Sequence, residues 1–287
     1  MHHADSPQPT PSDTRRRSGG SPIVRFVGVN KSFGRQRVLR GLDLEFNEGQ
    51  TTVVLGPSGS GKSVILKHIV GLMKPDTGQI WYRDQRVDLL TERQLAPLRR
   101  ETGFLFQLSA LFDSMSIAEN LEFPLTEHTT LKPDERRARI EAALAVVDLR
   151  GVEKKFPAQL SGGQQRRAAL ARSVILRPSL MLYDEPTTGL DPIRSDGIAE
   201  LIVKLQRETG LTSVVVTHDL ACMRKVADRV VMLYEGRIIV DGTPEDLDRS
   251  TDPHVQHFIT GTAEDDVDRE PADEHHHQPA PGARSRA

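Results

Sequence analysis

The chain contains 287 residues, and its 38 Lys and Arg residues nearly balance its 40 Asp and Glu residues, which gives a formal net charge of −2 at pH 7. That length allows one large domain or two small ones, and the near-neutral charge argues against a strongly basic nucleic-acid-binding protein. No apolar run is long enough to predict a transmembrane helix, and the single cysteine, Cys222, excludes an intrachain disulfide framework and fits a reducing compartment.

The two ends of the chain differ in composition from its middle. Residues 1–21 are rich in Pro, Ser and Gly, carry the arginines Arg15–Arg17 and lack apolar periodicity, so we expect a disordered arm. They also lack the apolar segment of a secretory signal peptide, which argues against export. Residues 264–287 are rich in acidic side chains and are predicted to form a disordered tail. The residues between them, 22–263, are expected to form one folded domain.

The first part of this domain, residues 22–55, is predicted to be β structure. Apolar residues alternate with polar ones over 42–46, as in a strand with one buried face. The β-branched run Thr51–Leu55 ends at a glycine and predicts a second kind of strand, one that is buried on both faces. A helix is expected directly afterwards, over 61–73, where apolar residues recur at helical spacing.

The middle of the chain is predicted to be helical. Residues 108–160 are expected to be mostly helix, and one of these helices begins near Pro133, a residue type favoured in the first helical turn. Another helix is expected over 161–176. Cys222 is expected on a later helix, where packing against the core suits it better than redox or metal chemistry.

The second half of the domain alternates between strands and helices. Leu180–Tyr183 and Thr212–Thr217 are short apolar strands, separated by a helix of about 199–208. Val230–Tyr234 and Ile238–Asp241 flank a short turn and predict a hairpin. Strands that alternate with helices and are rich in buried β-branched residues indicate an α/β fold, with a parallel sheet covered by helices. The helical middle is expected to be inserted into it.

A glycine-rich segment links the predicted strand at 51–55 to the helix that follows. Its sequence is Gly56-Pro57-Ser58-Gly59-Ser60-Gly61-Lys62-Ser63, which matches the phosphate-binding pattern G-x-x-x-x-G-K-[ST]. The glycines let the backbone curl so that several N–H groups point at one anion, and the helix adds its positive end. Lys62 is expected to reach the β- and γ-phosphates of a nucleotide and Ser63 to coordinate Mg²⁺.

Other strand ends supply candidate partners for such a site. Asp184 and Glu185 follow a buried strand, and the carboxyl ends of parallel strands meet at one edge of a sheet. Asp184 is placed to hold Mg²⁺, and Glu185 to orient or deprotonate the attacking water. His218 follows another strand and is expected to contact the γ-phosphate or the water, while the amide of Gln107 is a candidate for the Mg²⁺ shell.

A second helix start carries anion-binding chemistry. Leu160-Ser161-Gly162-Gly163-Gln164 opens a helix with Ser161 as the expected N-cap, and its two glycines expose backbone N–H groups.

With this element the chain resembles the ATP-binding subunits of ABC transporters, over roughly residues 22–245. In that resemblance Gln107 corresponds to the Q-loop residue, Leu160–Gln164 to the signature, Asp184-Glu185 to the Walker B end, Gly189–Asp191 to the D-loop and His218 to the switch histidine.

The resemblance implies a P-loop NTPase fold. It has a RecA-like parallel sheet core, an N-terminal antiparallel β subdomain and an inserted helical subdomain over about 108–175. It also implies ATP and Mg²⁺ as ligands. The residues implied for ATP binding are Phe33, which would stack on adenine, and the loop Gly56, Pro57, Ser58, Gly59, Ser60, Gly61, Lys62, Ser63 and Val64. Val64 departs from the family pattern, in which many members carry a second hydroxyl residue.

The resemblance further implies a head-to-tail dimer. ATP on the loop of one copy would be closed over by Ser161, Gly162, Gly163 and Gln164 of the other copy, so that two nucleotides hold the subunits together. Such a subunit acts with an integral membrane permease, and hydrolysis by Glu185 and His218 releases the dimer.

Three shorter stretches are similar to the ATPases of the bacterial Mla and Mce lipid transporters. They are Leu105–Met115, Pro124–Thr129 and Asp252–Gly261. This closer resemblance implies phospholipid cargo and partners with MCE and STAS domains. It also implies a place on the cytoplasmic face of the bacterial inner membrane, and a C-terminal segment, 252–261, that reaches the second copy.

Two alternatives stay open. The first is the ATPase of an importer for amino acids or another small solute, since cargo contacts lie in partner chains. The second is a soluble ABC ATPase that acts on nucleic acid or ribosomes. The second is disfavoured because the folded part has room for one such domain, shows no sustained heptads and has a near-neutral charge, so we expect no nucleic-acid partner.

Overall fold

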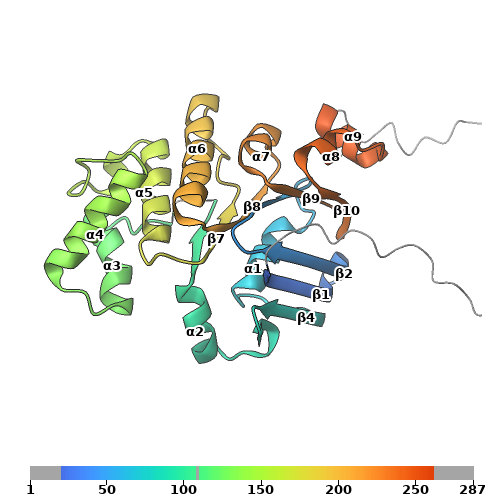
Figure 1. The fold of residues 1–287 in the computed structure, drawn as a ribbon, viewed down its shortest axis with the longest axis horizontal. Coiled ribbons are helices and arrows are strands. Elements are labelled where there is room, and N and C mark those ends of the chain that lie inside the picture. Colours follow the sequence, from blue (N-terminus) through green and yellow to red (C-terminus); the bar gives the residue numbers. More distant parts are fainter. Residues whose placement is uncertain (1–20, 108–109, 262–287) are drawn as a thin grey trace, which may run out of the picture.

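The computed structural model describes residues 21–107 and 110–261. The disordered arm predicted over 1–21, apart from Ser21, and the acidic tail predicted over 264–287 therefore lie outside the described residues. Within the described ranges the chain forms two sheets, a helix between them and several helices around them (Figure 1).

The smaller sheet is antiparallel and four-stranded, in the order β2-β1-β4-β5. Its strands are β1 (Pro22–Phe33), β2 (Gln36–Asn47), β4 (Thr77–Tyr82) and β5 (Gln85–Arg86). The predicted alternation holds in β2, where Leu42, Leu44 and Phe46 are at most 3% exposed. The β structure predicted over 22–55 is thus confirmed, whereas β4 and β5 were not predicted from the sequence.

The larger sheet is six-stranded, in the order β10-β9-β3-β8-β7-β6. Its strands are β3 (Thr51–Leu55), β6 (Thr102–Leu105), β7 (Leu180–Asp184), β8 (Thr212–Thr217), β9 (Arg229–Tyr234) and β10 (Arg237–Gly242). All neighbours run parallel except the hairpin of β9 and β10. The predicted parallel sheet and hairpin are confirmed, and the carboxyl ends of the five parallel strands meet at one edge.

Helices cover both faces of the larger sheet. Helix α1 (Lys62–Ile69) lies between the two sheets (Figure 1) and buries Ile65, Leu66 and Ile69 among residues of both. On the other face lie α6 (Pro192–Thr209) and α7 (Leu220–Val226). The described chain also contains α2 (Glu92–Arg100), α8 (Pro244–Asp248) and α9 (Pro253–Thr260), with short 3₁₀ turns at Val87–Leu89 and Pro157–Gln159.

Two predicted helix boundaries were wrong. The helix predicted over 61–73 ends at Ile69, because Gly71 takes a positive φ of 66° and packs beneath Leu95. The helix predicted over about 199–208 begins seven residues earlier, at Pro192, because the Asp191 side chain accepts a hydrogen bond from the Arg194 N–H and caps a polar first turn. Apolar spacing alone does not reveal such a turn.

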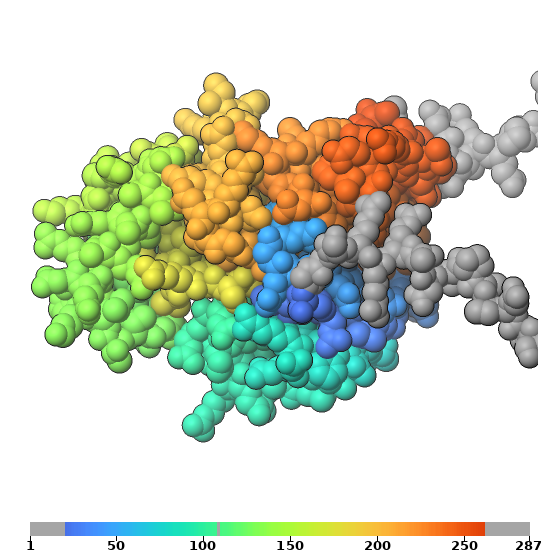
Figure 2. Space-filling view, in the orientation of Figure 1, coloured from blue at the N-terminus to red at the C-terminus, as the bar shows by residue number. Residues whose placement is uncertain are grey.

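Three helices form a lobe at one end of the molecule. They are α3 (Ile117–His128), α4 (Pro133–Val146) and α5 (Gly162–Val174), and their inner residues, such as Leu121, are fully buried. The lobe lies at the left of Figure 1, and its green surface is set off from the two sheets in Figure 2. Pro133 is the first residue of α4, as predicted.

Two further sequence expectations concern buried and apolar residues. Cys222 lies on α7 and is 3% exposed, and burial raises the pKa of its thiol to about 12, so it packs in the core as expected. Within the described ranges, the helices are all too short or too polar to cross a membrane.

Candidate functional site

The predicted site residues gather where the parallel strands of the larger sheet end. Strand β3 leads into the loop Gly56–Ser63, β7 ends in Asp184 and Glu185, and β8 is followed by His218. The strands β3, β8 and β7 are adjacent, with Val54, Val216 and Asp184 in register. This register brings three chain segments, far apart in sequence, to one edge of the sheet.

The loop between β3 and α1 requires glycine at its two ends. Gly56 has a φ of 151°, and a Cβ there would lie 2.2 Å from the Leu233 carbonyl oxygen. Gly61 has a φ of 104°, and a Cβ there would lie 2.8 Å from Cγ1 of Val38. Side chains at these positions would strain the backbone and collide with neighbours, so the loop curls tightly only because both residues are glycine.

The curled loop leaves a row of backbone donors without protein partners. Within the described residues, the N–H groups of Gly61, Lys62 and Ser63 donate no hydrogen bond to the protein. They lie at the start of α1, where the helix dipole adds partial positive charge. An anion such as a phosphate group fits this arrangement.

Lys62 lies against the same loop and is only 6% exposed. Its Nζ donates to the carbonyl oxygens of Gly56 (2.7 Å) and Pro57 (3.0 Å) and lies 3.9 Å from Oε1 of Glu185. Burial lowers the pKa of the Lys62 amine, against the opposing effect of Glu185 and Asp184, which raise it. The ammonium group is thus a desolvated positive charge, which binds phosphate more strongly than an exposed one.

Ser63 and Asp184 form the second contact between the loop and β7. The Ser63 hydroxyl donates to Oδ1 of Asp184 at 2.7 Å. Burial raises the pKa of Asp184, and Glu185 raises it further, while the bond from Ser63 lowers it. A hydroxyl and a carboxylate side by side are hard oxygen donors, and Mg²⁺ is commonly held by such a pair together with phosphate oxygens and water. The residues present therefore fit this ion.

Glu185 is held in an unusual backbone conformation. Its φ is 49°, in the left-handed region that non-glycine residues seldom adopt, and its N–H donates to the Val216 carbonyl oxygen at 2.9 Å. Strain of this kind persists only where surrounding contacts impose it, and it concentrates at functional positions.

The carboxylate of Glu185 has two unequal oxygens. Oε2 is 2.9 Å from Nδ1 of His218, and it accepts hydrogen bonds from the hydroxyls of Thr188 (3.1 Å) and Thr217 (3.3 Å). Oε1 faces the Lys62 ammonium across 3.9 Å. Two hydroxyl donors and the close imidazole nitrogen therefore surround one oxygen and leave the other available for chemistry. Neither threonine was predicted, because nothing in the spacing of a hydroxyl residue reveals which carboxylate it contacts.

Two predicted residues lie outside this cluster. Gln107 follows β6, is exposed and forms no hydrogen bond with Ser63 or Asp184 in the described structure. Phe33 ends β1 with 46% of its surface exposed, and Nζ of Lys31 lies 5.7 Å from its ring centroid. Next to it, a hollow of about 430 Å³ lies between Arg35–Val38 and Pro57–Ser60, beside the phosphate-binding loop.

The segment Ser161–Gln164 forms a well-capped helix start. The Ser161 hydroxyl accepts from the Gln164 N–H (3.4 Å), and the Gln164 side chain accepts from the Ser161 N–H (3.1 Å). Ser161 and Gly162 are exposed. In the described chain, no hydrogen bond or ion pair joins this segment to residues 56–63, and α5 and α1 lie in different parts of the molecule (Figure 1).

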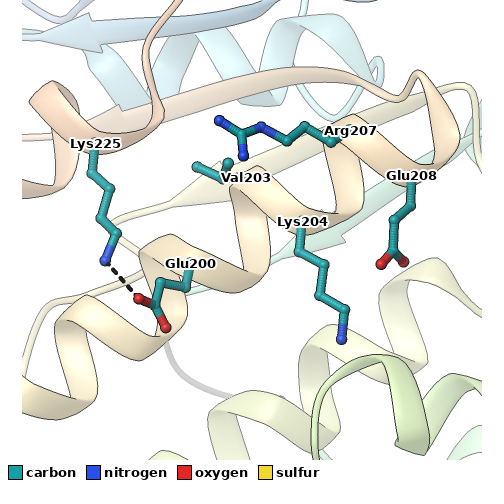
Figure 3. A pocket seen from close by; sticks show the side chains of 6 residues that line it. All are labelled: Glu200, Val203, Lys204, Arg207, Glu208 and Lys225. Carbon is teal, nitrogen blue, oxygen red and sulfur yellow. Dashed lines mark hydrogen bonds and ion pairs between the residues drawn. The ribbon is translucent and has the colours of Figure 1, made fainter.

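A larger hollow elsewhere lacks this chemistry. About 510 Å³ in volume, it lies along α6 and α7 (Figure 3), where Lys225 contacts Glu200 at 3.2 Å. Its lining mixes positive and negative side chains and contains none of the residues of the cluster around Glu185: Glu200, Val203, Lys204, Arg207, Glu208 and Lys225. The candidate site is therefore the edge of the sheet rather than this hollow.

Comparisons with known proteins agree with this geometry. A family model described as ABC transporter matches residues 39–188. The chain is 38% identical over 265 residues to the probable ribonucleotide transport ATP-binding protein Mkl of Mycobacterium tuberculosis, covering 91% of this chain and 74% of Mkl. It is 36% identical over 262 residues to the intermembrane phospholipid transport system ATP-binding protein MlaF of Escherichia coli K12, covering 91% of this chain and 97% of MlaF.

A solved structure has the same fold. It is the dimeric post-hydrolysis state of the ATP-binding cassette MJ0796 bound to ADP and Pi. The TM-score is 0.71 and the identity 34%, and the alignment covers 77% of this chain and 99% of MJ0796.

Proposed function

Because the chain belongs to the ABC transporter family, and is an ATP-binding subunit that hydrolyses ATP, we propose that it drives a transporter of phospholipids. The observation that supports ATP hydrolysis is that five side chains lie together at one edge of the sheet: Lys62, Ser63, Asp184, Glu185 and His218. The similarity that supports the cargo is the match to MlaF, which extends over nearly the whole of both chains.

In this proposal the loop holds the triphosphate of ATP. The free N–H groups at the start of α1 bind phosphate oxygens, and Lys62 turns from its own loop carbonyls to the β- and γ-phosphates. Gly56 to Ser60 and Val64 complete the cradle. Phe33 stacks on the adenine beside the hollow at Arg35–Val38.

Ser63 and Asp184 would hold Mg²⁺, with the amide of Gln107 joining the shell. The ion would neutralise charge on the phosphate oxygens. Since the hydroxyl and the carboxylate already lie 2.7 Å apart, little rearrangement is needed to present both oxygens to one cation.

Glu185 orients the attacking water and accepts its proton. We assign this role to Oε1, because His218, Thr188 and Thr217 occupy Oε2. With Nδ1 of His218 directed at the carboxylate, the other ring nitrogen is available to the γ-phosphate.

The site is completed by a second copy of the chain. Ser161 and Gly162 are exposed and lie apart from the loop of their own chain, so they are free to meet ATP bound to another copy, together with Gly163 and Gln164. The dimeric state of MJ0796 supports this arrangement. In each copy the domain would be residues 22–263, with the helical part over about 108–175.

The remaining partners follow from the phospholipid proposal. They are an integral membrane permease, an MCE-domain lipid-binding protein and a STAS-domain protein, with this chain on the cytoplasmic face of a bacterial inner membrane. Helix α9, within the segment 252–261 proposed to reach the second copy, packs on its own chain, where the ring of His254 stacks on Tyr234 at 4.2 Å.

A second candidate cargo is a small solute, because the name of Mkl specifies ribonucleotide transport. The two cargoes are separated by reconstituting this chain with its permease in vesicles and supplying ATP. We expect transfer of labelled phospholipid that stops in the Glu185→Gln variant. Uptake of labelled ribonucleotide or amino acid, with no phospholipid transfer, would contradict the proposed cargo while leaving the ATPase assignment in place.

A further inference from the structure

Arg166 is a buried cation whose hydrogen bonds, among the described residues, go to backbone carbonyl groups. It lies on α5 and is 5% exposed. Its Nη1 donates to the Phe106 carbonyl oxygen at 2.7 Å, and its Nη2 donates to the Thr188 carbonyl oxygen at 3.3 Å. In the described part of the chain it forms no ion pair with a carboxylate, and burial lowers the pKa of its guanidinium. A buried charge without a counter-ion is costly, so the two carbonyl contacts require an explanation.

Both carbonyl groups belong to segments next to the catalytic cluster. Phe106 precedes Gln107, and its ring stacks on Phe104 with centroids 4.0 Å apart. Thr188 closes the turn that begins at Glu185, since its N–H donates to the Glu185 carbonyl oxygen at 3.3 Å and its hydroxyl donates to Oε2 of the same residue. A shift of the Thr188 backbone therefore moves the carboxylate that orients the attacking water.

Arg166 also lies close to the exposed helix start. It is one turn beyond Ser161–Gly163 on α5, and an α-helix of this length moves as a rigid body. A change in the position of the helix start is thus passed to the guanidinium. The rigid fork of arginine can hold two carbonyl groups at once, which a lysine ammonium on a flexible stem does less well.

We propose that Arg166 is a positioning residue that couples the helix start at Ser161–Gly163 to the Glu185 turn and to the segment before Gln107. This inference rests on the proposed function, because it takes Glu185 as the residue that orients water and Ser161–Gly163 as a contact of the partner's nucleotide. In this proposal, the position of α5 in each copy sets the position of Glu185 in the same copy. The coupling acts on turnover and leaves ATP affinity unchanged, since within the described residues Arg166 forms no hydrogen bond with residues 56–63.

The next residue provides a matched control. Arg167 lies on the same helix, but its Nη1 donates to the Val147 carbonyl oxygen at 3.3 Å, in the helical lobe, and its side chain is 30% exposed. In the described structure it forms no hydrogen bond or ion pair with the site residues. Replacing it removes the same side chain from the same helix without touching Phe106 or Thr188.

The test compares Arg166→Met, Arg166→Lys and Arg167→Met in the full-length chain. Three quantities are measured: the Kd for ATP, the kcat and KM of phosphate release, and the Tm. For Arg166→Met we expect kcat to fall about tenfold or more, with Kd and KM within about twofold of the wild type, because misplaced catalytic groups cost rate rather than affinity. Arg166→Lys keeps the charge and N–H donors, though on a single nitrogen, and should lose less, and Arg167→Met should keep the wild-type kcat.

The outcomes separate this inference from the proposed function. A wild-type chain that neither binds nor hydrolyses ATP would overturn both. A wild-type chain that hydrolyses ATP, with equal kcat in Arg166→Met and Arg167→Met, would overturn the coupling alone. If Arg166→Met does not fold, Arg166→Lys decides: a reduced kcat at unchanged ATP affinity supports the coupling, and a wild-type kcat refutes it.

Discussion

At the scale of single residues, the site is defined by how its charges are desolvated and directed. Lys62, Asp184 and Glu185 lie close to one another at the end of the sheet. Burial lowers the pKa of Lys62 and raises the pKa of Asp184, so it favours the neutral form of both groups. One oxygen of Glu185 accepts from two hydroxyls and lies close to His218, and the other faces Lys62. In the proposed mechanism the same side chains would bind anionic phosphate and present a base to water.

The first prediction concerns Glu185→Gln. The amide keeps the size of the side chain but cannot accept a proton, so we expect ATP binding to persist while phosphate release falls by about 100-fold or more. The ATP-bound dimer should accumulate and be visible by light scattering. Phosphate release at the wild-type rate would remove the assignment of Glu185 as the base.

The second prediction concerns Asp184 and pH. Because burial raises the folded-state pKa of Asp184 above its ordinary value, ionised Asp184 destabilises the fold. That cost is absent while the group is protonated, and it appears as the pH rises from its unfolded pKa through its higher folded pKa. Asp184→Asn keeps the side-chain shape without the charge, so it should gain stability relative to the wild type as the pH rises.

At neutral pH we expect this gain to be about 1 kcal/mol in the free energy of unfolding, with ATP hydrolysis lost. Urea unfolding at pH 4 and pH 7 measures it. Equal differences between variant and wild type at both pH values would show that the Asp184 charge carries no such cost.

At the scale of elements, the need for glycine in the loop between β3 and α1 differs from one position to the next, because the space around each glycine differs. Gly56 and Gly59 both have positive φ, but a Cβ at Gly56 would approach the Leu233 carbonyl oxygen to 2.2 Å, whereas at Gly59 nothing lies within 4 Å. The loop is therefore pressed against the end of β9 at Gly56 and open to solvent at Gly59.

The third prediction compares alanine at these two glycines. Gly59→Ala should cost about 1 kcal/mol, the penalty of a left-handed backbone alone. Gly56→Ala adds a clash with backbone and should cost about 3 kcal/mol. Thermal unfolding of both variants tests this difference. An equal loss of stability in the two would mean that the backbone at residue 56 shifts to accommodate a Cβ, and it would contradict the prediction.

The elements also explain what could be predicted from the sequence. Buried β-branched runs such as Thr212–Thr217 are predicted as strands because such runs seldom form other structures. The loop 56–63 and the pair Asp184-Glu185 are recognisable from the types and spacing of their residues. The strands β4 and β6 and the helix α2 lack strong periodicity, and α6 begins with a polar turn, so their presence or bounds were missed. Thr217 and Arg166 contact segments that are distant in sequence, and Thr188 contacts Glu185 across a turn whose shape no local pattern reveals.

At the scale of the whole molecule, one chain holds both halves of the proposed composite site, and the two do not meet within it. The loop 56–63 and the cluster around Glu185 lie at the edge of the sheet, and the exposed start of α5 lies in the helical lobe (Figure 1). A second copy related by a two-fold axis would bring each half to the other and create two equivalent sites. ATP would then act as part of the interface, and its hydrolysis as the signal for release.

The most direct test of this account uses mixed dimers that carry Lys62→Ala and Ser161→Ala. With one change in each copy, both fall in the same composite site and the other site is intact, so we predict roughly half of the wild-type occluded ATP. With both changes in one copy, each site has one defect, and we predict almost no occluded ATP. Equal loss in the two pairings would contradict the completion of each site by a second copy.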